Sequence, residues 1–135
     1  MALQQGLTTN FKRRCLAVLE GSTLMMALYD ETASLGPAVA VYTAEGEVTG
    51  TGYTAGGVLL TGVGIVVDDT VAYLTFDPPE WDPANFSARG ALIYDAADAN
   101  STVAVLDFGS LKVATTRFAP AMPVPTASTA LVRLE

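Results

Sequence analysis

Histidine is absent from this 135-residue sequence, and cysteine occurs only once, as Cys15. Without histidine, the chain lacks the commonest general base and metal ligand, and also the usual switch near neutral pH. A single cysteine excludes both an intramolecular disulfide and a zinc site built from several thiolates. Any catalysis would therefore depend on carboxylates, Tyr, Ser, Lys or Cys15, and we expect packing alone to hold the fold together.

Charged residues are also scarce, at 16% of the chain, whereas soluble proteins contain about 25%. The formal net charge is −7, from 7 basic and 14 acidic side chains. Proteins that bind nucleic acids neutralise phosphates with clustered Lys and Arg, so nucleic acids and anionic membranes are poor partners for this chain. Two explanations of the low charge stay open. Either neighbouring molecules cover part of the surface, or Ala, Thr, Ser and Gly form a bland exterior.

Long hydrophobic runs are missing too. The apolar run over residues 63–67 is too short to cross a bilayer, and the first residues lack the basic start, apolar block and cleavage site of a signal peptide. We therefore expect a soluble protein made in a reducing compartment. Its length suits one domain with a single core.

What the sequence does contain is a series of short apolar segments that alternate like β-strands. Residues 23–29 are apolar on both faces, which predicts a central strand that is covered on both sides. The polar turn at residues 95–101 separates two alternating segments, which predicts a hairpin. Strands are predicted at residues 23–29, 38–42, 58–60, 65–67, 70–76, 86–94, 102–108 and 111–118, with a turn at 109–110 and a possible closing strand at 131–134. About eight short strands without helical connections predict a mainly β fold, an antiparallel β-sandwich or jelly roll.

One short helix is predicted near residues 9–20, because Phe11, Cys15, Leu16 and Leu19 form an apolar stripe at helical spacing. Thr9 or Asn10 can cap its start and Gly21 can end it. Cys15 lies on the stripe, which predicts a core residue and not a nucleophile.

Three of the seven basic residues, Lys12, Arg13 and Arg14, lie near the start of this helix, where the helix dipole disfavours cations. They are candidate contacts with an acidic surface on another subunit, although simple solvation of the outer helix face is the more economical interpretation. At the other end of the chain, residues 119–135 form a Pro-rich arm after the single domain of residues 1–118. Pro123 and Pro125 in this arm are further candidate contacts.

Seven glycines gather between Glu45 and Gly64. Their spacing does not match a dinucleotide fingerprint, and the following residues are β-branched, so no phosphate-binding helix is predicted. The glycines are expected to supply positive φ angles at turns and bulges between strands. Tyr53 and Glu47 are the candidate surface contacts of this stretch.

Trp81 lies between Glu80 and Asp82, a combination found in carbohydrate sites. A single Trp in a Pro-rich loop is more often an anchor, against its own core or against a neighbouring subunit, and Trp81 is therefore a candidate intersubunit contact. Acidic residues also cluster in two turns, at 68–69 and at 95–100, where calcium could bind, but the spacing does not fit an EF-hand and solvated turns explain it better. No catalytic, cofactor or metal residue is predicted, and the chain is not expected to be an enzyme.

Five short stretches occur in an informative order. They are residues 7–12 (Leu-Thr-Thr-Asn-Phe-Lys), 27–29 (Ala-Leu-Tyr), 46–57 (Gly-Glu-Val-Thr-Gly-Thr-Gly-Tyr-Thr-Ala-Gly-Gly), 88–95 (Ala-Arg-Gly-Ala-Leu-Ile-Tyr-Asp) and 104–109 (Ala-Val-Leu-Asp-Phe-Gly). Together they resemble a group of small virion structural proteins encoded by tailed bacteriophages. The resemblance spans roughly residues 7–109 and leaves out the Pro-rich tail.

The resemblance implies a non-enzymatic protein that assembles on a phage particle. A capsid cement or decoration protein on the capsid exterior is expected first, and a tail, neck or fibre-adaptor component second. Its partners would be the major capsid protein and copies of itself, most simply in a homotrimer, after synthesis in the bacterial cytoplasm. A carbohydrate-binding module centred on Trp81 is the third hypothesis.

Overall fold

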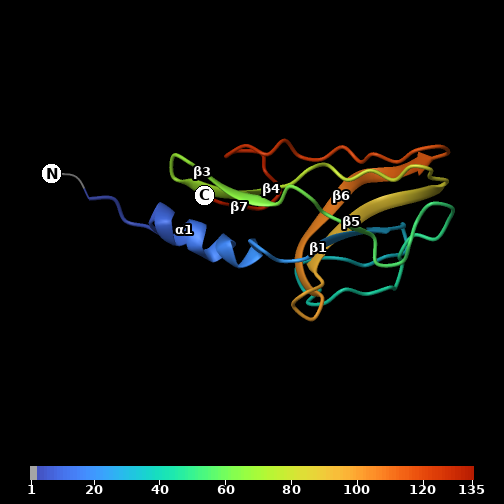
Figure 1. Cartoon of the computed structure of the whole chain (residues 1–135), viewed down its shortest axis with the longest axis horizontal. Coiled ribbons are helices and arrows are strands. Elements are labelled where there is room, and N and C mark those ends of the chain that lie inside the picture. The colour runs from blue at the N-terminus through green and yellow to red at the C-terminus, as the bar shows by residue number, and fades with distance from the viewer. Residues whose placement is uncertain (1–2) are drawn as a thin grey trace.

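In the computed structural model, which describes residues 3–135, seven strands form two sheets beside one α-helix (Figure 1). The strands are β1 (Leu24–Tyr29), β2 (Val58–Leu59), β3 (Gly64–Asp68), β4 (Val71–Thr75), β5 (Phe86–Asp95), β6 (Ser101–Ala114) and β7 (Arg133–Leu134). The strand order is β2-β1-β5-β6 in the first sheet and β3-β4-β7 in the second, and all neighbouring strands are antiparallel.

Both sheets contribute to one main core. Leu28 of β1, Ile93 of β5 and Leu74 of β4 belong to the same buried cluster, which also contains Trp81 and Phe86. Burial of such apolar surface is the main stabilising contribution to a fold of this kind. The predicted mainly β architecture of the antiparallel sandwich type is therefore confirmed, with seven strands where about eight were expected.

Strand β1 is covered on both faces. Met26 and Leu28 face the main core, whereas Ala27 and Tyr29 belong to a smaller cluster on the opposite face of the sheet. The chain that follows β1 covers this second cluster and packs Leu35 against it. Because β1 also lies between β2 and β5, the prediction of a covered central strand is confirmed.

The turn predicted at residues 109–110 is wrong, because β6 runs through them. β5 and β6 form the predicted hairpin, but the pairing shifts between the pairs Ala88↔Lys112 and Gly90↔Asp107. A β-bulge absorbs the extra residues of β6, and the glycine within it has a φ of 84°. The two strands expected on either side of a turn are thus one bent strand.

The strand predicted at residues 38–42 is also wrong. This segment makes only an isolated bridge, Val41↔Ser101, and the amide of Thr102 donates to the carbonyl of Ala40 at 3.1 Å. In the described chain, no strand pairs with the rest of β6 on the side away from β5. The β6 edge is therefore open over most of its length.

The C-terminal arm folds back over its own chain. It lacks regular structure until β7, which pairs with β4 and takes the place of the predicted closing strand. Ala130 is buried, and Met122, Leu131 and Val132 pack against the main core. Part of the arm therefore packs against the core of its own chain.

The helix α1 (Thr9–Leu16) continues into a 3₁₀ turn, η1 (Ala17–Leu19), close to the predicted bounds. Its N-cap is Thr8, one residue before the predicted positions, and the Thr8 hydroxyl accepts a hydrogen bond from the amide of Phe11 at 3.3 Å. The chain then turns at Gly21, whose φ of 75° favours glycine, so the predicted end is close to the observed one.

The buried face of α1 differs from the predicted stripe. Leu16 is buried, but Phe11 and Cys15 are exposed, and Lys12 takes an inward position with 7% of its surface exposed. The Lys12 ammonium donates to the carbonyl of Thr70 at 2.8 Å. A lysine can bury its carbon chain in this way when its charged end finds an acceptor. The prediction that Cys15 is a core residue is wrong.

Candidate functional site

The glycine-rich stretch from Glu45 to Gly64 lies close against the rest of the chain. A Cβ added to Gly57 would lie 1.9 Å from the carbonyl oxygen of Met26, and one on Gly52 would lie 1.9 Å from that of Pro83. Both glycines have positive φ angles, 86° and 90°. The expectation that these glycines serve turns is thus confirmed, and close backbone approach is a second reason for them.

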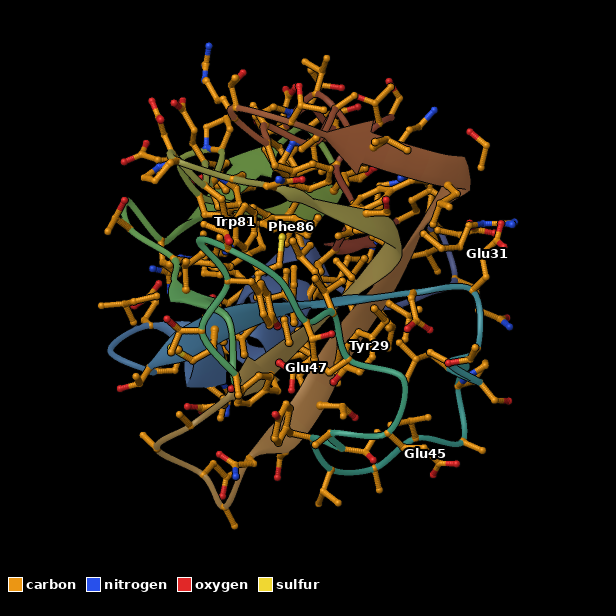
Figure 2. All side chains as sticks on the ribbon, turned by 90° about the vertical axis from the view of Figure 1, so that its right-hand side faces the viewer. Tyr29, Glu31, Glu45, Glu47, Trp81 and Phe86 are labelled. Carbon is orange, nitrogen blue, oxygen red and sulfur yellow. The ribbon has the colours of Figure 1, made fainter. Side chains whose placement is uncertain are left out.

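Glu47 lies at the centre of this stretch. The Tyr42 hydroxyl donates to its Oε1 at 2.5 Å, and its Oε2 accepts from the Tyr53 hydroxyl and, at 2.8 Å, from the amide of Gly56. Glu47 also forms a backbone bridge with Tyr29, which lies next to it in Figure 2. The polar groups of Glu47 and Tyr53 are engaged within the chain. Both side chains are half-buried, and their role as surface contacts stays a prediction.

Four of the five tyrosines, Tyr29, Tyr42, Tyr53 and Tyr94, surround this carboxylate, and we call them with Glu47 the tyrosine cluster. Burial raises the pKa of each phenol above its usual value of 10.0, because it disfavours the phenolate. The negative charge of Glu47 raises these pKa values further. All four phenols are thus neutral near pH 7, and they join the glycine-rich stretch to the first sheet.

Trp81 lies inside the chain, with only 3% of its surface exposed. Its ring centroid is 6.5 Å from that of Tyr53, and it lies near Phe86 in the core (Figure 2). The neighbouring Glu80 forms an ion pair with Arg117 at 2.5 Å. A buried indole cannot stack on a sugar, so the carbohydrate hypothesis fails. Trp81 is an anchor for its own core and not the intersubunit contact that was expected.

The three basic residues of α1 have different surroundings. Lys12 is buried, as described above, and Arg13 forms an exposed ion pair with Glu20 at 2.9 Å. Arg14 is exposed, and within residues 3–135 no carboxylate lies within ion-pair distance of it. Of the three candidates, Arg14 is therefore the cation whose charge is available to a partner.

Pro123 and Pro125 line an apolar hollow of about 250 Å³ between the arm and the second sheet. Leu74 and Phe76 form part of its opposite wall. Pro123 is half-buried and Pro125 is exposed. These prolines thus contact their own chain on one side, and the structure leaves Pro125 accessible on the other.

Sequence reasoning missed an exposed apolar side of the helix. Leu7, Phe11, Cys15 and Val18 recur at helical spacing, and all four are exposed, Val18 to 73%. Together with Arg14, they form what we call the outer helix face. The sequence contains apolar residues on two sides of this helix, Phe11 and Cys15 on one and Leu16 and Leu19 on the other. Because Lys12 lies on the same side as Leu16 and Leu19, the sequence did not indicate that this side is the buried one.

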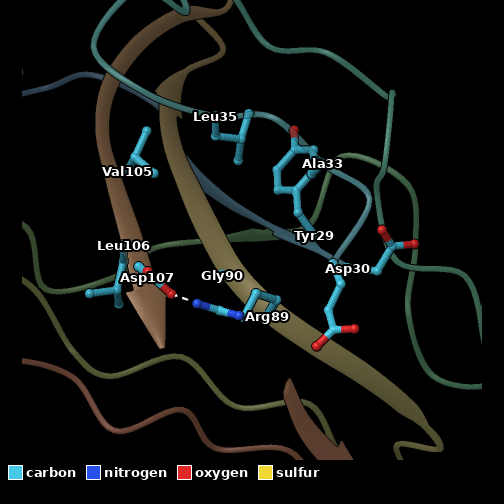
Figure 3. Close-up of a pocket in the computed structure, with 10 residues that line it drawn as sticks. Tyr29, Asp30, Ala33, Leu35, Arg89, Gly90, Val105, Leu106 and Asp107 are labelled. Atoms are coloured by element: carbon cyan, nitrogen blue, oxygen red, sulfur yellow. Dashed lines mark hydrogen bonds and ion pairs between the residues drawn. The ribbon is translucent and has the colours of Figure 1, made fainter. Parts of the chain in front are cut away.

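A second missed feature is a hollow of about 230 Å³ on the outer face of the first sheet (Figure 3). It is lined by Tyr29, Asp30, Glu31, Ala33, Leu35, Arg89, Gly90, Val105, Leu106 and Asp107. Arg89 donates to Asp107 at 3.0 Å, and this bond lowers the pKa of Asp107 and raises that of Arg89. Because three carboxylates and one arginine line it, we call it the acidic hollow.

The acidic turn at residues 95–100 is organised by Asp95 itself. Its Oδ1 accepts from the amides of Thr23 and Ala97 at 3.1 and 3.0 Å. In the part of the chain that the structure describes, no three His, Cys, Asp or Glu side chains come together as a metal-binding group. The turn therefore fits the simpler of its two interpretations, a hydrogen-bonded loop.

No helix in residues 3–135 has the length and apolar character needed to cross a membrane. Comparisons with protein-family models, with curated proteins and with solved structures gave no match to this chain.

Proposed function

We propose that this chain is a structural protein of a tailed-bacteriophage virion, a capsid decoration (cement) protein that binds the outside of the assembled shell as an oligomer. Support comes from the five ordered stretches that resemble such proteins. It also comes from the exposed apolar side chains that surround a well-packed core. Exposed apolar surface on a soluble protein is typical of a site that binds another protein.

The open edge of β6 is the observation that carries this proposal. β6 is 14 residues long, and beyond Thr102 only β5 pairs with it in the described chain. Leu111 and Val113 are exposed near its end, Val113 to 70%. An open edge can accept an extended segment of a partner through main-chain hydrogen bonds. An arm of the major capsid protein is the occupant that fits a decoration protein.

The mechanism is stabilisation by selective binding. A protein that binds the assembled shell and not its free subunits shifts the equilibrium toward the shell. At a free concentration 100 times the Kd, the gain is about 2.7 kcal/mol per site. Contacts that bridge adjacent shell subunits would add this free energy at each joint.

Co-sedimentation with shells tests the proposal. Shells assembled from the major capsid protein of the same phage are mixed with the wild-type chain, and we expect binding that saturates at a ratio near one chain per shell subunit. Val113→Asp places a charge beside the β6 edge and should weaken this binding at least tenfold. Val67→Asp is the matched control, because Val67 is exposed on β3 of the other sheet and should leave binding unchanged.

Copy number in purified particles separates decoration from the tail or neck alternative. A decoration protein should be present in numbers comparable to the shell subunits, whereas a tail or neck ring contains far fewer copies. A low copy number, or wild-type chain that stays in the supernatant, would overturn the decoration role.

A further inference from the structure

We infer that copies of this chain associate head to tail, with the outer helix face of one copy docked in the acidic hollow of the next. This inference deepens the proposed function by naming the contact that forms the oligomer, and it rests on the oligomeric part of that proposal. Four observations carry it: the composition of the helix face, the lining of the hollow, the distribution of charge and the position of the two surfaces on the chain.

The outer helix face has the composition of a contact surface. Phe11 is exposed on α1 and Val18 on the 3₁₀ turn that continues it, and Leu7 is exposed just before the N-cap Thr8. Arg14 is exposed on the same helix without a carboxylate partner in the described chain. Aromatic residues and arginine are enriched in the centres of protein interfaces. Three exposed apolar side chains beside an arginine that has no ion-pair partner within residues 3–135 therefore match this composition.

The acidic hollow is complementary to this face. Leu35, Val105 and Leu106 provide apolar lining, and Asp30 provides a carboxylate next to it (Figure 3). Glu31 also lines the hollow and provides a second carboxylate. Its volume of about 230 Å³ is below the range of about 300–1,000 Å³ that holds drug-sized ligands. The hollow therefore suits one or two protein side chains, with a cation beside them.

Charge is distributed unevenly along the chain in the way that head-to-tail docking requires. Residues 1–20 contain three basic and one acidic side chain, whereas residues 21–135 contain four basic and 13 acidic ones. The two parts thus have formal charges of +2 and −9. Two acidic bodies repel each other, but the helix of one copy is attracted to the body of the next.

The two surfaces lie apart on the same chain. α1 lies at one end of the long axis, and β1 runs away from it toward Tyr29, which lines the hollow (Figure 1). Different patches on each side make the interface heterologous, and such interfaces form closed rings when the rotation closes. Three copies, the number suggested by analogy with capsid decoration proteins, would form such a ring.

Charge reversal tests the pairing in the purified chain, without shells. Analytical ultracentrifugation should show that the wild type self-associates, and that Arg14→Glu and Glu31→Arg each raise the dissociation constant at least tenfold. The double variant Arg14→Glu/Glu31→Arg should regain most of the association. Lys112→Glu, a change at another exposed cation, is the control and should behave like the wild type.

Cross-linking tests the geometry, because Cys15 is the single native thiol and is exposed on the outer helix face. Wild-type chain is mixed with Cys15→Ser/Leu35→Cys chain and treated with a short bismaleimide. We expect a mixed dimer joined through positions 15 and 35. In the control mixture, Cys15→Ser/Val113→Cys replaces the second chain and should give little product.

Two outcomes would overturn the inference. One is a wild type that stays monomeric at all accessible concentrations, and the other is a mixed cross-link that forms equally well at positions 35 and 113. A monomer that still binds shells would remove this interface while leaving the decoration role intact. An oligomer that fails to bind shells would keep this interface and overturn the decoration role.

Discussion

The tyrosine cluster and the outer helix face differ in whether their side chains find partners within the same chain. In the cluster, both carboxylate oxygens of Glu47 accept hydrogen bonds from the same chain, and the adjoining glycines allow the backbone to approach closely. On the outer helix face, Phe11 and Val18 are exposed to solvent, whereas Lys12 of α1 is buried. The first region is complete within one chain, whereas the second has apolar surface left for a partner.

If the proposed interface is right, the most recognisable part of this sequence is not its contact surface. The glycine-rich stretch is distinctive because close approach and positive φ angles restrict its residues. The outer helix face looks ordinary, since its residues only need to be apolar. The predictions below test whether the first region is indeed internal and the second external.

The largest effect is expected for Gly57→Ala. The new Cβ would lie 1.9 Å from the carbonyl oxygen of Met26, a backbone atom of the central strand, and φ is 86°. We expect a loss of at least about 4 kcal/mol in the free energy of unfolding, or failure to fold, because strain and overpacking act together. Urea denaturation followed by tryptophan fluorescence measures it.

Gly21→Ala is the control for this substitution. Gly21 also has a positive φ, 75°, but no atom lies within 4 Å of the added Cβ. Backbone strain alone should cost about 1–2 kcal/mol. Equal losses in the two variants would show that close approach at Gly57 contributes nothing.

A smaller loss is expected for Glu47→Ala. The change removes the acceptor of Tyr42, Tyr53 and the Gly56 amide in a partly buried site. Leaving such donors unsatisfied costs about 1–3 kcal/mol, and we expect about 2–3 kcal/mol in urea unfolding. Glu45→Ala changes an exposed carboxylate two residues away and should stay within about 0.5 kcal/mol. A Glu47 variant as stable as the Glu45 variant would mean that the cluster is not a structural centre.

Much of the fold follows from local patterns in the sequence. The apolar run of β1 and the alternation of β5 and β6 identify the first sheet, because burial on one or two faces leaves a clear period. The bulge in β6 could not be predicted in the same way. A glycine at position 109 fits a turn or a bulge equally well, and only the register with β5 decides between them.

The candidate surfaces were less predictable, because they depend on residues far apart in the sequence. Lys12 is buried because the carbonyl of Thr70, 58 residues away, accepts a hydrogen bond from its ammonium. With Lys12 inside, the apolar stripe containing Cys15 faces outward. Trp81 is likewise buried by Tyr53 and Phe118, which no local pattern connects to it. The acidic hollow combines a loop with three strands, so sequence spacing alone could not reveal it.

Alkaline pH should weaken the tyrosine cluster. The pKa of Tyr29 in the folded chain lies above its usual value of 10.0, because the phenol is buried and lies near Glu47. Above pH 10, the unfolded chain therefore releases a proton that the folded chain keeps, and stability falls by up to about 1.4 kcal/mol per pH unit for this group. Below pH 10, Tyr29 contributes no pH dependence.

Urea unfolding at intervals between pH 8 and pH 11, on the order of half a unit apart, measures this slope. Tyr29→Phe should show a smaller slope above pH 10, although its stability at pH 8 is lower because the bond to the Thr43 carbonyl is lost. Identical slopes in the variant and the wild type would show that Tyr29 titrates alike in the folded and unfolded chains.

The smallest effect on the isolated chain is expected for Val18→Ser. Because Val18 is 73% exposed, its loss should change the free energy of unfolding by less than about 0.5 kcal/mol at low protein concentration. Leu16→Ala, on the inner side of the same helix, should cost about 2–5 kcal/mol. At high protein concentration, the wild type and the Val18→Ser variant should differ more in stability. Association stabilises the wild type by mass action, and it stabilises the Val18 variant less. Thermal unfolding over a range of concentrations measures both effects.

A Val18 variant that loses more than about 1 kcal/mol when dilute would place this side chain in the core of its own chain. The contrast between the two regions would then disappear.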